Sequence, residues 1–316
     1  MLKFFKHSYI SQLVVIVLLI VALWIPVFLT YRFPDDAGEP TSLALTIFTF
    51  VVFGVSVFFF NSMMSVNQLV TRNSSIGAFI YVLCMSIIPI HTACFPFLLA
   101  CPLIMIAMQT ILLIYQVEKP EAYLMNVGFF IAIASMFYFP AIFLIIWALL
   151  SMTIMDIRQV KHYFIPIMGV IFPYFILFTF FYFNGTLLGK IEQYSLIIND
   201  LNLEKLGIGT FETIVLAIVF IMVILSLMMI KSGNADNSVV TRKKVNITLW
   251  IFFFSFLMLF TRKPAMYNGL IFVVLAMFVS MALCYIKKSK IVDIILAVFT
   301  VAVIASQYLQ LFGIEL

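Results

Sequence analysis

The densest group of acidic side chains follows the first long apolar run of the chain. Arg32, Asp35, Asp36 and Glu39 lie close together in the segment YRFPDDAGEP. At a membrane face, two neighbouring carboxylates supply a general base for a hydroxyl acceptor or help to bind a cation. With Asp35 or Asp36 as that base, the segment is a candidate catalytic loop. The alternative is a solvated turn, because the surrounding prolines and glycine are turn formers.

Three basic or titratable residues are the other candidates for chemistry. Arg262 and Lys263 share a short turn and, with Arg32 and Glu39, form the candidate substrate contacts. Arg and Lys neutralise phosphate or diphosphate groups, although here they could equally pair with acidic residues or lipid head groups. His91 titrates near neutral pH and is an auxiliary proton carrier, or else an incidental loop residue. We predict no metal and no cofactor, because the four cysteines and three histidines are scattered and form no CxxC or HExxH pattern.

The composition requires these residues to work at a membrane. Of 316 residues, 65% are hydrophobic and 10% are charged, and the mean hydropathy is +1.21. A soluble globule cannot hide that much apolar surface, so the sequence predicts an all-α polytopic membrane protein. The basic residues lie in short interhelical loops, where they orient the chain in the bilayer and do not indicate nucleic-acid binding. No buried chain of ionisable groups is visible, which argues against a proton-driven pump.

The central apolar segment, residues 126–156, decides the topology. As one helix its apolar part would be about 43 Å long at about 1.5 Å per residue, whereas the hydrocarbon core of a bilayer is about 30 Å thick. Pro140 lies midway and lacks the amide that a continuous helix needs. We therefore predict a Pro-broken hairpin of two short spans that meet at Phe139 and Pro140.

The remaining apolar runs complete a bundle of about eleven crossings. They comprise residues 9–30, 43–64, 76–90, 95–116, 162–183, 211–230, 247–261, 265–286 and 291–312. With the N-terminus on the inner side, thirteen of the 18 basic residues lie on the inner side of the membrane and five on the outer side; a single span at 126–156 would change this to eight and ten. Because cytoplasmic loops are rich in Lys and Arg, the hairpin is favoured and the C-terminus is expected outside.

Loops divide the chain into predicted parts. Residues 1–230 form the main membrane bundle, 231–246 a flexible cytoplasmic linker and 247–316 a C-terminal three-helix membrane segment. The outer loops are residues 31–42 and 186–210. In the second, apolar residues recur at helical spacing between polar ones, so it forms either a helix on the membrane surface or a lid over the bundle.

Two families share stretches with this sequence. Residues 69–89, 126–150 and 164–185 resemble an uncharacterised family of bacterial polytopic inner-membrane proteins, which implies a location in the bacterial inner membrane. Some members carry a beta-carotene monooxygenase label. We reject that label, because it implies an iron site of several histidines on a soluble propeller.

The second resemblance is to the C-type glycosyltransferase membrane fold, which uses polyprenyl-phosphate sugars. In that fold an outer loop with an acidic base follows the first span; short spans ending in proline and a G-x-x-x-G hairpin come next. RFPDDA, IGAFIYVLCMSIIP and GFFIAIASMFYFP are similar to these parts, with Asp35 or Asp36 at the base position and Ala132 replacing the second glycine. The outer loop is shorter than in the fold and a soluble C-terminal domain is missing, which suggests a shortened, inactive relative.

The sequence thus leaves two functions open. The first is a glycosyltransferase-like protein of the bacterial inner membrane that handles a polyprenyl-phosphate-linked substrate at the outer leaflet. The second is a non-catalytic membrane subunit, or scaffold, of an envelope assembly or export complex that contacts other membrane proteins. In both, the lipid bilayer is the main partner.

Overall fold

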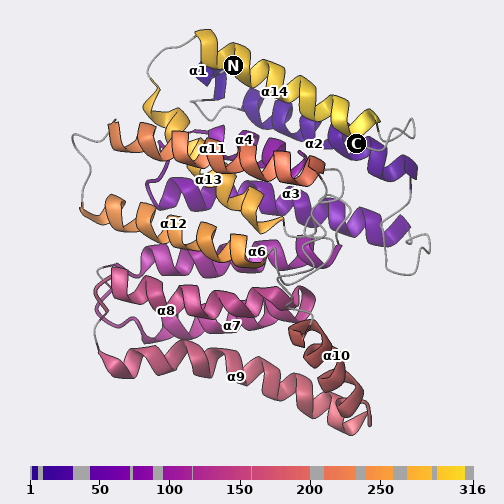
Figure 1. The fold of residues 1–316 in the computed structure, drawn as a ribbon, viewed down its shortest axis with the longest axis vertical. Helices are drawn as coiled ribbons and strands as arrows, with labels where there is room; N and C mark the ends of the chain where they lie inside the picture. The colour runs from indigo at the N-terminus through magenta and orange to yellow at the C-terminus, as the bar shows by residue number, and fades with distance from the viewer. Residues whose placement is uncertain are drawn as a thin grey trace. The chain divides into compact units, whose positions relative to one another are not determined.

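The structure is a computed structural model, and its described part is almost entirely helical (Figure 1). It describes residues 2–5, 10–30, 43–71, 74–87, 95–115, 117–157, 159–199, 210–232, 239–258, 269–286 and 290–309. No strand occurs within these ranges. The prediction of an all-α protein is confirmed for this part of the chain.

Four of the described helices are long and apolar enough to cross a membrane. They contain the spans Ile10–Leu29, Ala44–Val66, Pro96–Leu113 and Val160–Phe183. Further apolar helices of ten to 17 residues accompany them. The chain therefore has the character of a helical membrane protein, whereas the number of crossings and their orientation stay predictions.

The helices form two compact units, each assembled from separated stretches of the chain. Unit 1 comprises residues 1–98, 209–237 and 269–316, and unit 2 comprises residues 99–208 and 238–268. This grouping by contacts places the helices after residue 269 with the N-terminal ones. The parts that we predicted from the sequence were consecutive instead, with a boundary at residues 231–246.

Unit 1 is built around one short, fully enclosed helix. Its helices are α1 (Leu2–Phe5), α2 (Ile10–Thr30), α3 (Leu43–Val66), α4 (Ile76–Met85), α11 (Thr210–Ser232), α13 (Leu270–Tyr285) and α14 (Lys290–Leu309). Every residue of α4 is buried, and α4 packs against α2, α3 and α13. The ring of Tyr81 stacks on Phe60 of α3, with 4.7 Å between ring centroids. Aromatic packing of this kind makes α4 the core of the unit.

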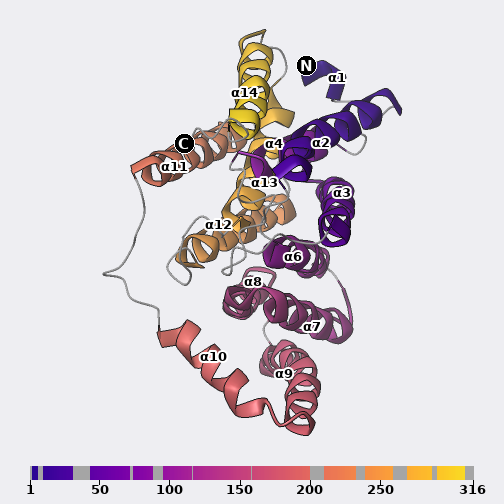
Figure 2. The same ribbon diagram turned by 90° about the vertical axis from the view of Figure 1, so that its right-hand side faces the viewer.

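Unit 2 contains the segment that the sequence analysis placed at the centre of the topology. Its elements are most of α6 (Phe95–Leu113), then α7 (Glu121–Phe137), the 3-10 helix η1 (Phe139–Phe143), α8 (Leu144–Ile154), α9 (Val160–Phe183), α10 (Leu187–Asn199) and α12 (Val239–Met258). Figure 2 shows α7, α8 and α9 as neighbouring rods of this unit. Contacts join α7 with α9, and α8 with α9 and α12.

The expected interruption at Pro140 is present. α7 ends at Phe137, Pro140 is buried within η1, and α8 begins at Leu144. The two arms run in opposite directions, because the start of α7 and the end of α8 lie at the same end of unit 2, where side chains of both arms contact α9 and α12. Proline weakens a helix locally, because it lacks the amide donor and its ring crowds the preceding turn. Pro26, Pro102 and the two prolines of α9 nevertheless lie inside continuous helices, so the break at Pro140 also depends on the packing around it.

Most apolar runs of the sequence are helical in the structure. Part of the stretch that we predicted as a linker, residues 231–246, is helical as well. The described helix α12 begins at Val239, so residues 239–246 are helical, where we expected a flexible linker. The polar and basic composition of that stretch indicated a loop. In the structure, Lys243 in this helical stretch contacts Asp156 and the ring of Tyr115.

The closest helix packing in unit 2 joins α7 to α9. A Cβ atom added at Gly128 would lie 2.8 Å from the carbonyl carbon of Pro166, and Gly169 faces Met125 and Phe129 in return. Small residues allow two backbones to approach in this way, which is a principal means of joining helices in membranes. Gly128 of the G-x-x-x-A stretch therefore has a packing role.

Candidate functional site

The residues that the sequence proposes for chemistry all lie outside the described part of the chain. They are Arg32, Asp35, Asp36, Glu39, His91, Arg262 and Lys263. The structure therefore neither brings them together nor separates them, and their roles stay predictions. The described residues nevertheless form two polar clusters, at opposite ends of unit 2.

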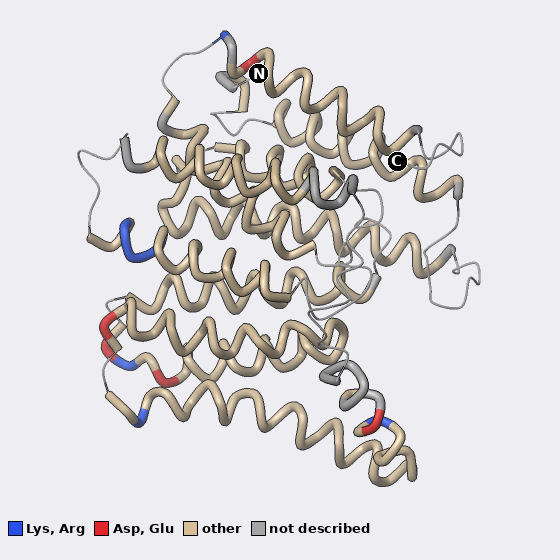
Figure 3. The backbone as a smooth tube through the Cα atoms, in the orientation of Figure 1, with Lys and Arg blue, Asp and Glu red and all other residues tan. Residues whose placement is uncertain are grey.

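The first cluster contains charged residues, and we call it the charged end. It consists of Glu121 at the start of α7, Asp156 after α8, His162 in the first turn of α9 and Lys243 in α12. Figure 3 shows the charged residues of unit 2 concentrated at this end and on α10. The middle parts of the other helices of this unit carry none. Such a distribution is typical of helices that leave a bilayer for water.

An ion pair links α8 to α12 at the charged end. Asp156 has a φ of 63°, in the left-handed region that Asp enters more readily than most residues. Its carboxylate is paired with the Nζ of Lys243, and the same Nζ lies 4.9 Å from the centre of the Tyr115 ring. Partial burial lowers the pKa of the neighbouring Lys244. Lys243 of α12 thus contacts both Asp156, which follows α8, and Tyr115, which follows α6.

A second contact links α7 to α9 at the same end. The Nε2 of His162 lies 3.3 Å from the Oε1 of Glu121, which is a hydrogen bond when Nε2 carries the proton. The pKa of the Glu121 carboxyl is lowered, first by a hydrogen bond from the backbone amide of Glu121 and then by the contact with His162. The His162 side chain is 8% exposed, and its Nδ1 has no hydrogen-bond partner among the described residues. The pair fixes the start of α9 beside the start of α7.

We expect the ion pair between Asp156 and Lys243 to contribute little stability. The Asp156 side chain is 54% exposed, and exposed pairs contribute about 0–1 kcal/mol. A double-mutant cycle with Asp156→Asn and Lys243→Met isolates the pair, and asparagine keeps the left-handed backbone accessible. Unfolding of the four proteins in detergent should give a coupling energy of at most about 1 kcal/mol. A coupling several times larger would show that the pair is shielded from water.

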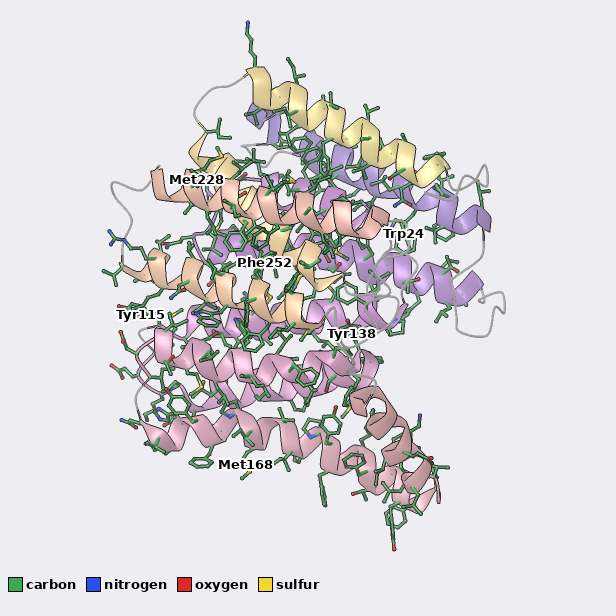
Figure 4. The ribbon with its side chains drawn as sticks, in the orientation of Figure 1. Trp24, Tyr115, Tyr138, Met168, Met228 and Phe252 are labelled. Atoms are coloured by element: carbon green, nitrogen blue, oxygen red, sulfur yellow. The ribbon has the colours of Figure 1, made fainter. Side chains whose placement is uncertain are left out.

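The second cluster contains hydroxyls and aromatic rings, and we call it the hydroxyl end. It consists of Ser135, Tyr138, Phe139, Tyr174 and Tyr194. In Figure 4, Tyr138 lies at the end of unit 2 opposite Tyr115. The hydroxyl oxygens of Ser135 and Tyr174 are 2.8 Å apart and join α7 to α9. Tyr194 of α10 stacks on Phe139 of η1, with 5.0 Å between ring centroids.

The hydroxyl end is suited to binding and not to acid-base chemistry. Partial burial raises the pKa of Tyr194, so this hydroxyl stays neutral at physiological pH. Neutral hydroxyls both donate and accept hydrogen bonds, and ring faces provide flat apolar surface. These are the groups that a hydroxylated ligand requires.

Neither cluster has the donor set of a metal centre. Within the described ranges, no group of three or more His, Cys, Asp or Glu side chains could hold a metal ion. Cys84 and Cys101 are buried, as is usual for cysteines that act as small apolar residues in a core.

Sequence reasoning did not find either cluster. Glu121 and His162 are 41 residues apart, and Asp156 and Lys243 are 87 apart. No local pattern connects residues at such separations. One available signal was Asp156 itself, an acidic residue that directly follows an apolar run.

Comparison with known proteins identifies no relative of this chain. No family model, curated protein or solved structure matches it. The functional argument therefore depends on the residues and their geometry.

Proposed function

We propose that the chain is an inner-membrane protein of the bacterial cell envelope that binds a polyprenyl-phosphate-linked substrate at the outer face of the membrane. The observation that carries the proposal is the hydroxyl end, where the buried hydroxyl of Ser135 is joined to that of the partly exposed Tyr174, and the partly exposed Tyr194 stacks on Phe139 beside apolar helices. A lipid-linked sugar combines a hydroxylated head with an apolar tail, and such a surface complements both parts.

Charge supports the orientation in this proposal. Lys119, Lys161 and Arg242–Lys244 belong to loops and helix starts at the charged end of unit 2, and basic residues favour the cytoplasmic side. The hydroxyl end then faces outward. The loop at residues 31–42 and the turn with Arg262 and Lys263 are predicted on that same side of the membrane.

In the proposed reaction, the loop at residues 31–42 supplies the general base, and basic residues of this loop and of the Arg262–Lys263 turn bind the phosphate. Asp35 or Asp36 takes the proton from an acceptor hydroxyl, whose oxygen attacks the anomeric carbon of the sugar. The bond from that carbon to the phosphate oxygen breaks, and polyprenyl phosphate leaves with the electron pair. Arg32, Arg262 and Lys263 stabilise the phosphate charge, Glu39 is a further substrate contact, and His91 is an auxiliary proton carrier.

Native mass spectrometry of the protein in native nanodiscs tests the substrate. We expect a retained polyprenyl phosphate or polyprenyl-linked sugar, lost from the double variant Arg262→Ala/Lys263→Ala. The matched control is Lys287→Ala/Lys288→Ala, which removes two basic residues from a loop predicted on the inner side. Only bulk lipid in the wild-type spectrum, or equal loss from both double variants, contradicts the proposal.

Catalysis is tested separately by rescue of a deletion strain. We expect the double variant Asp35→Asn/Asp36→Asn to be made normally yet to fail to rescue. Full rescue by this variant contradicts the catalytic role while leaving substrate binding open to the spectrometric result.

A second candidate function is a non-catalytic subunit of an envelope membrane complex. The observation in its favour is the exposure of α9. Of the residues in its membrane-length apolar stretch, 17% are buried, whereas 56% are buried in the corresponding stretch of α6. Met168, labelled in Figure 4, points away from the other helices of unit 2. A stoichiometric protein partner in the same mass spectra, with bulk lipid only, supports this function instead.

A further inference from the structure

The helix α10 leaves the end of α9 through a sharp turn. Gly185 has a φ of 66°, in the left-handed region where glycine is unstrained. The amide of Thr186 donates to the carbonyl of Phe181 at 3.0 Å, so the end of α9 is closed in the manner of a glycine cap. Figure 1 shows α10 inclined to α9 beyond this turn. The direction of α10 is thus set by the backbone of its first connection.

Two aromatic contacts hold one side of α10 to unit 2. Tyr194 stacks on Phe139 of η1, and the planes of their rings differ by 24°. The Nζ of Lys190 lies 5.6 Å from the centre of the Phe181 ring on α9. These contacts fix α10 across the hydroxyl end and agree with the lid that the sequence allowed.

Beside this held side, α10 carries apolar side chains that the described helices of unit 2 leave partly or largely exposed. Leu188 is 81% exposed and Ile191 is 48% exposed. With about 100° per residue, Leu188 and Ile191 are about 60° apart and share one face of the helix. A lid packed only on protein would turn these residues inward.

The exposed face of α10 continues the apolar surface of α9. Phe180, Tyr182 and Phe183, in the last turn of α9, are also exposed and directly precede the turn to α10. Since α9 is apolar enough to cross a membrane, an exposed apolar surface at its end is suited to contact with lipid. Exposed apolar side chains thus occur on both sides of the turn, in the last turn of α9 and at Leu188 and Ile191 of α10.

We propose that α10 is an interfacial helix, whose partner is the lipid surface. It inserts Leu188 and Ile191 at the boundary between head groups and acyl chains while Tyr194 anchors it to η1. Lys190 and Glu192 carry opposite charges, so binding of the described part of α10 rests on apolar contact and requires no anionic lipid. This proposal does not depend on the substrate proposed above.

Site-directed spin labelling of the full chain tests the position of α10. Single cysteines replace Leu188, Ile191 or Gly189 in a background whose four native cysteines are changed to alanine, and the labelled proteins are placed in phosphatidylcholine nanodiscs. Gly189→Cys is the matched control, because a side chain there meets nothing within 4 Å and points about 160° away from Ile191. Collision of each label with oxygen and with a water-soluble nickel chelate is measured.

We expect the labels at positions 188 and 191 to collide more with oxygen than with the chelate, and the label at 189 to do the reverse. This contrast should persist when anionic phosphatidylglycerol is added. Chelate access at all three positions would place α10 in water and overturn the proposal, and shielding of 188 and 191 from both reagents would show a protein cover and overturn it too. If the cysteine-free protein does not fold, a fluorescent amino acid at positions 188 and 189, quenched by brominated lipid, gives the same comparison with native cysteines.

Discussion

Gly128→Ala is expected to separate α7 from α9 and to reduce sharply the amount of folded protein. The added Cβ would meet the carbonyl group of Pro166, with the carbonyl carbon 2.8 Å away. These are backbone atoms, so no side-chain rotation relieves the clash and one helix must move. Overpacking of a core costs about 1–3 kcal/mol and occasionally more, and we expect the upper part of that range. The measurement is thermal stability in detergent, followed by size-exclusion chromatography.

Gly54→Ala in α3 is the control for the loss of glycine. A Cβ at Gly54 meets nothing within 4 Å, and alanine in a helix interior is favoured over glycine by about 0.5–1 kcal/mol. This variant should be as stable as the wild-type chain or more stable. A Gly128→Ala protein with unchanged stability would contradict the close approach of α7 and α9.

Trp147→Ala is expected to have the largest effect of any truncation in unit 2. Trp147 is almost completely buried in α8, and its Nε1 donates a hydrogen bond of 3.1 Å to the carbonyl oxygen of Ile247 in α12. Truncation of a buried Trp costs about 3–5 kcal/mol, because a cavity remains and its lining loses contacts. Chemical denaturation in detergent, with a probe on α12, measures this loss.

Trp147→Phe separates the hydrogen bond from the packing. Phenylalanine keeps most of the ring contact but cannot donate, so we expect a loss of about 1 kcal/mol. Equal stability of the Ala and Phe variants would show that the cavity around Trp147 does not matter. The contact between α8 and α12 would then need another explanation.

The sequence predicted the features that depend on neighbouring residues. The break at Pro140 was predictable because a proline ring acts on the preceding turn. The helix at residues 187–199 was predictable from the apolar spacing of the outer loop. The start of α12 at Val239 was missed, because the polar and basic composition of residues 239–246 is typical of a loop and the contacts of Lys243 with Asp156 and Tyr115 join residues far apart in the sequence.

Residues of the candidate sites were likewise predictable only where they are neighbours in the sequence. The close approach of Gly128 to Pro166 and the pair of Ser135 with Tyr174 join residues that are 38 and 39 positions apart in the chain. Only the three-dimensional packing of α7 on α9 brings them together. The acidic loop with Asp35 and Asp36 was recognised from composition, and it lies outside the described residues.

The enclosure of α4 has a consequence for how the chain is assembled during synthesis. With ten residues, α4 is about 15 Å long, roughly half the thickness of the hydrocarbon core. One of its principal neighbours, α13, begins at Leu270 and is synthesised nearly 200 residues later. Until the ribosome has delivered α13, part of the surface of α4 lacks its final protein neighbour. The core of unit 1 therefore closes late, after most of the chain has been synthesised.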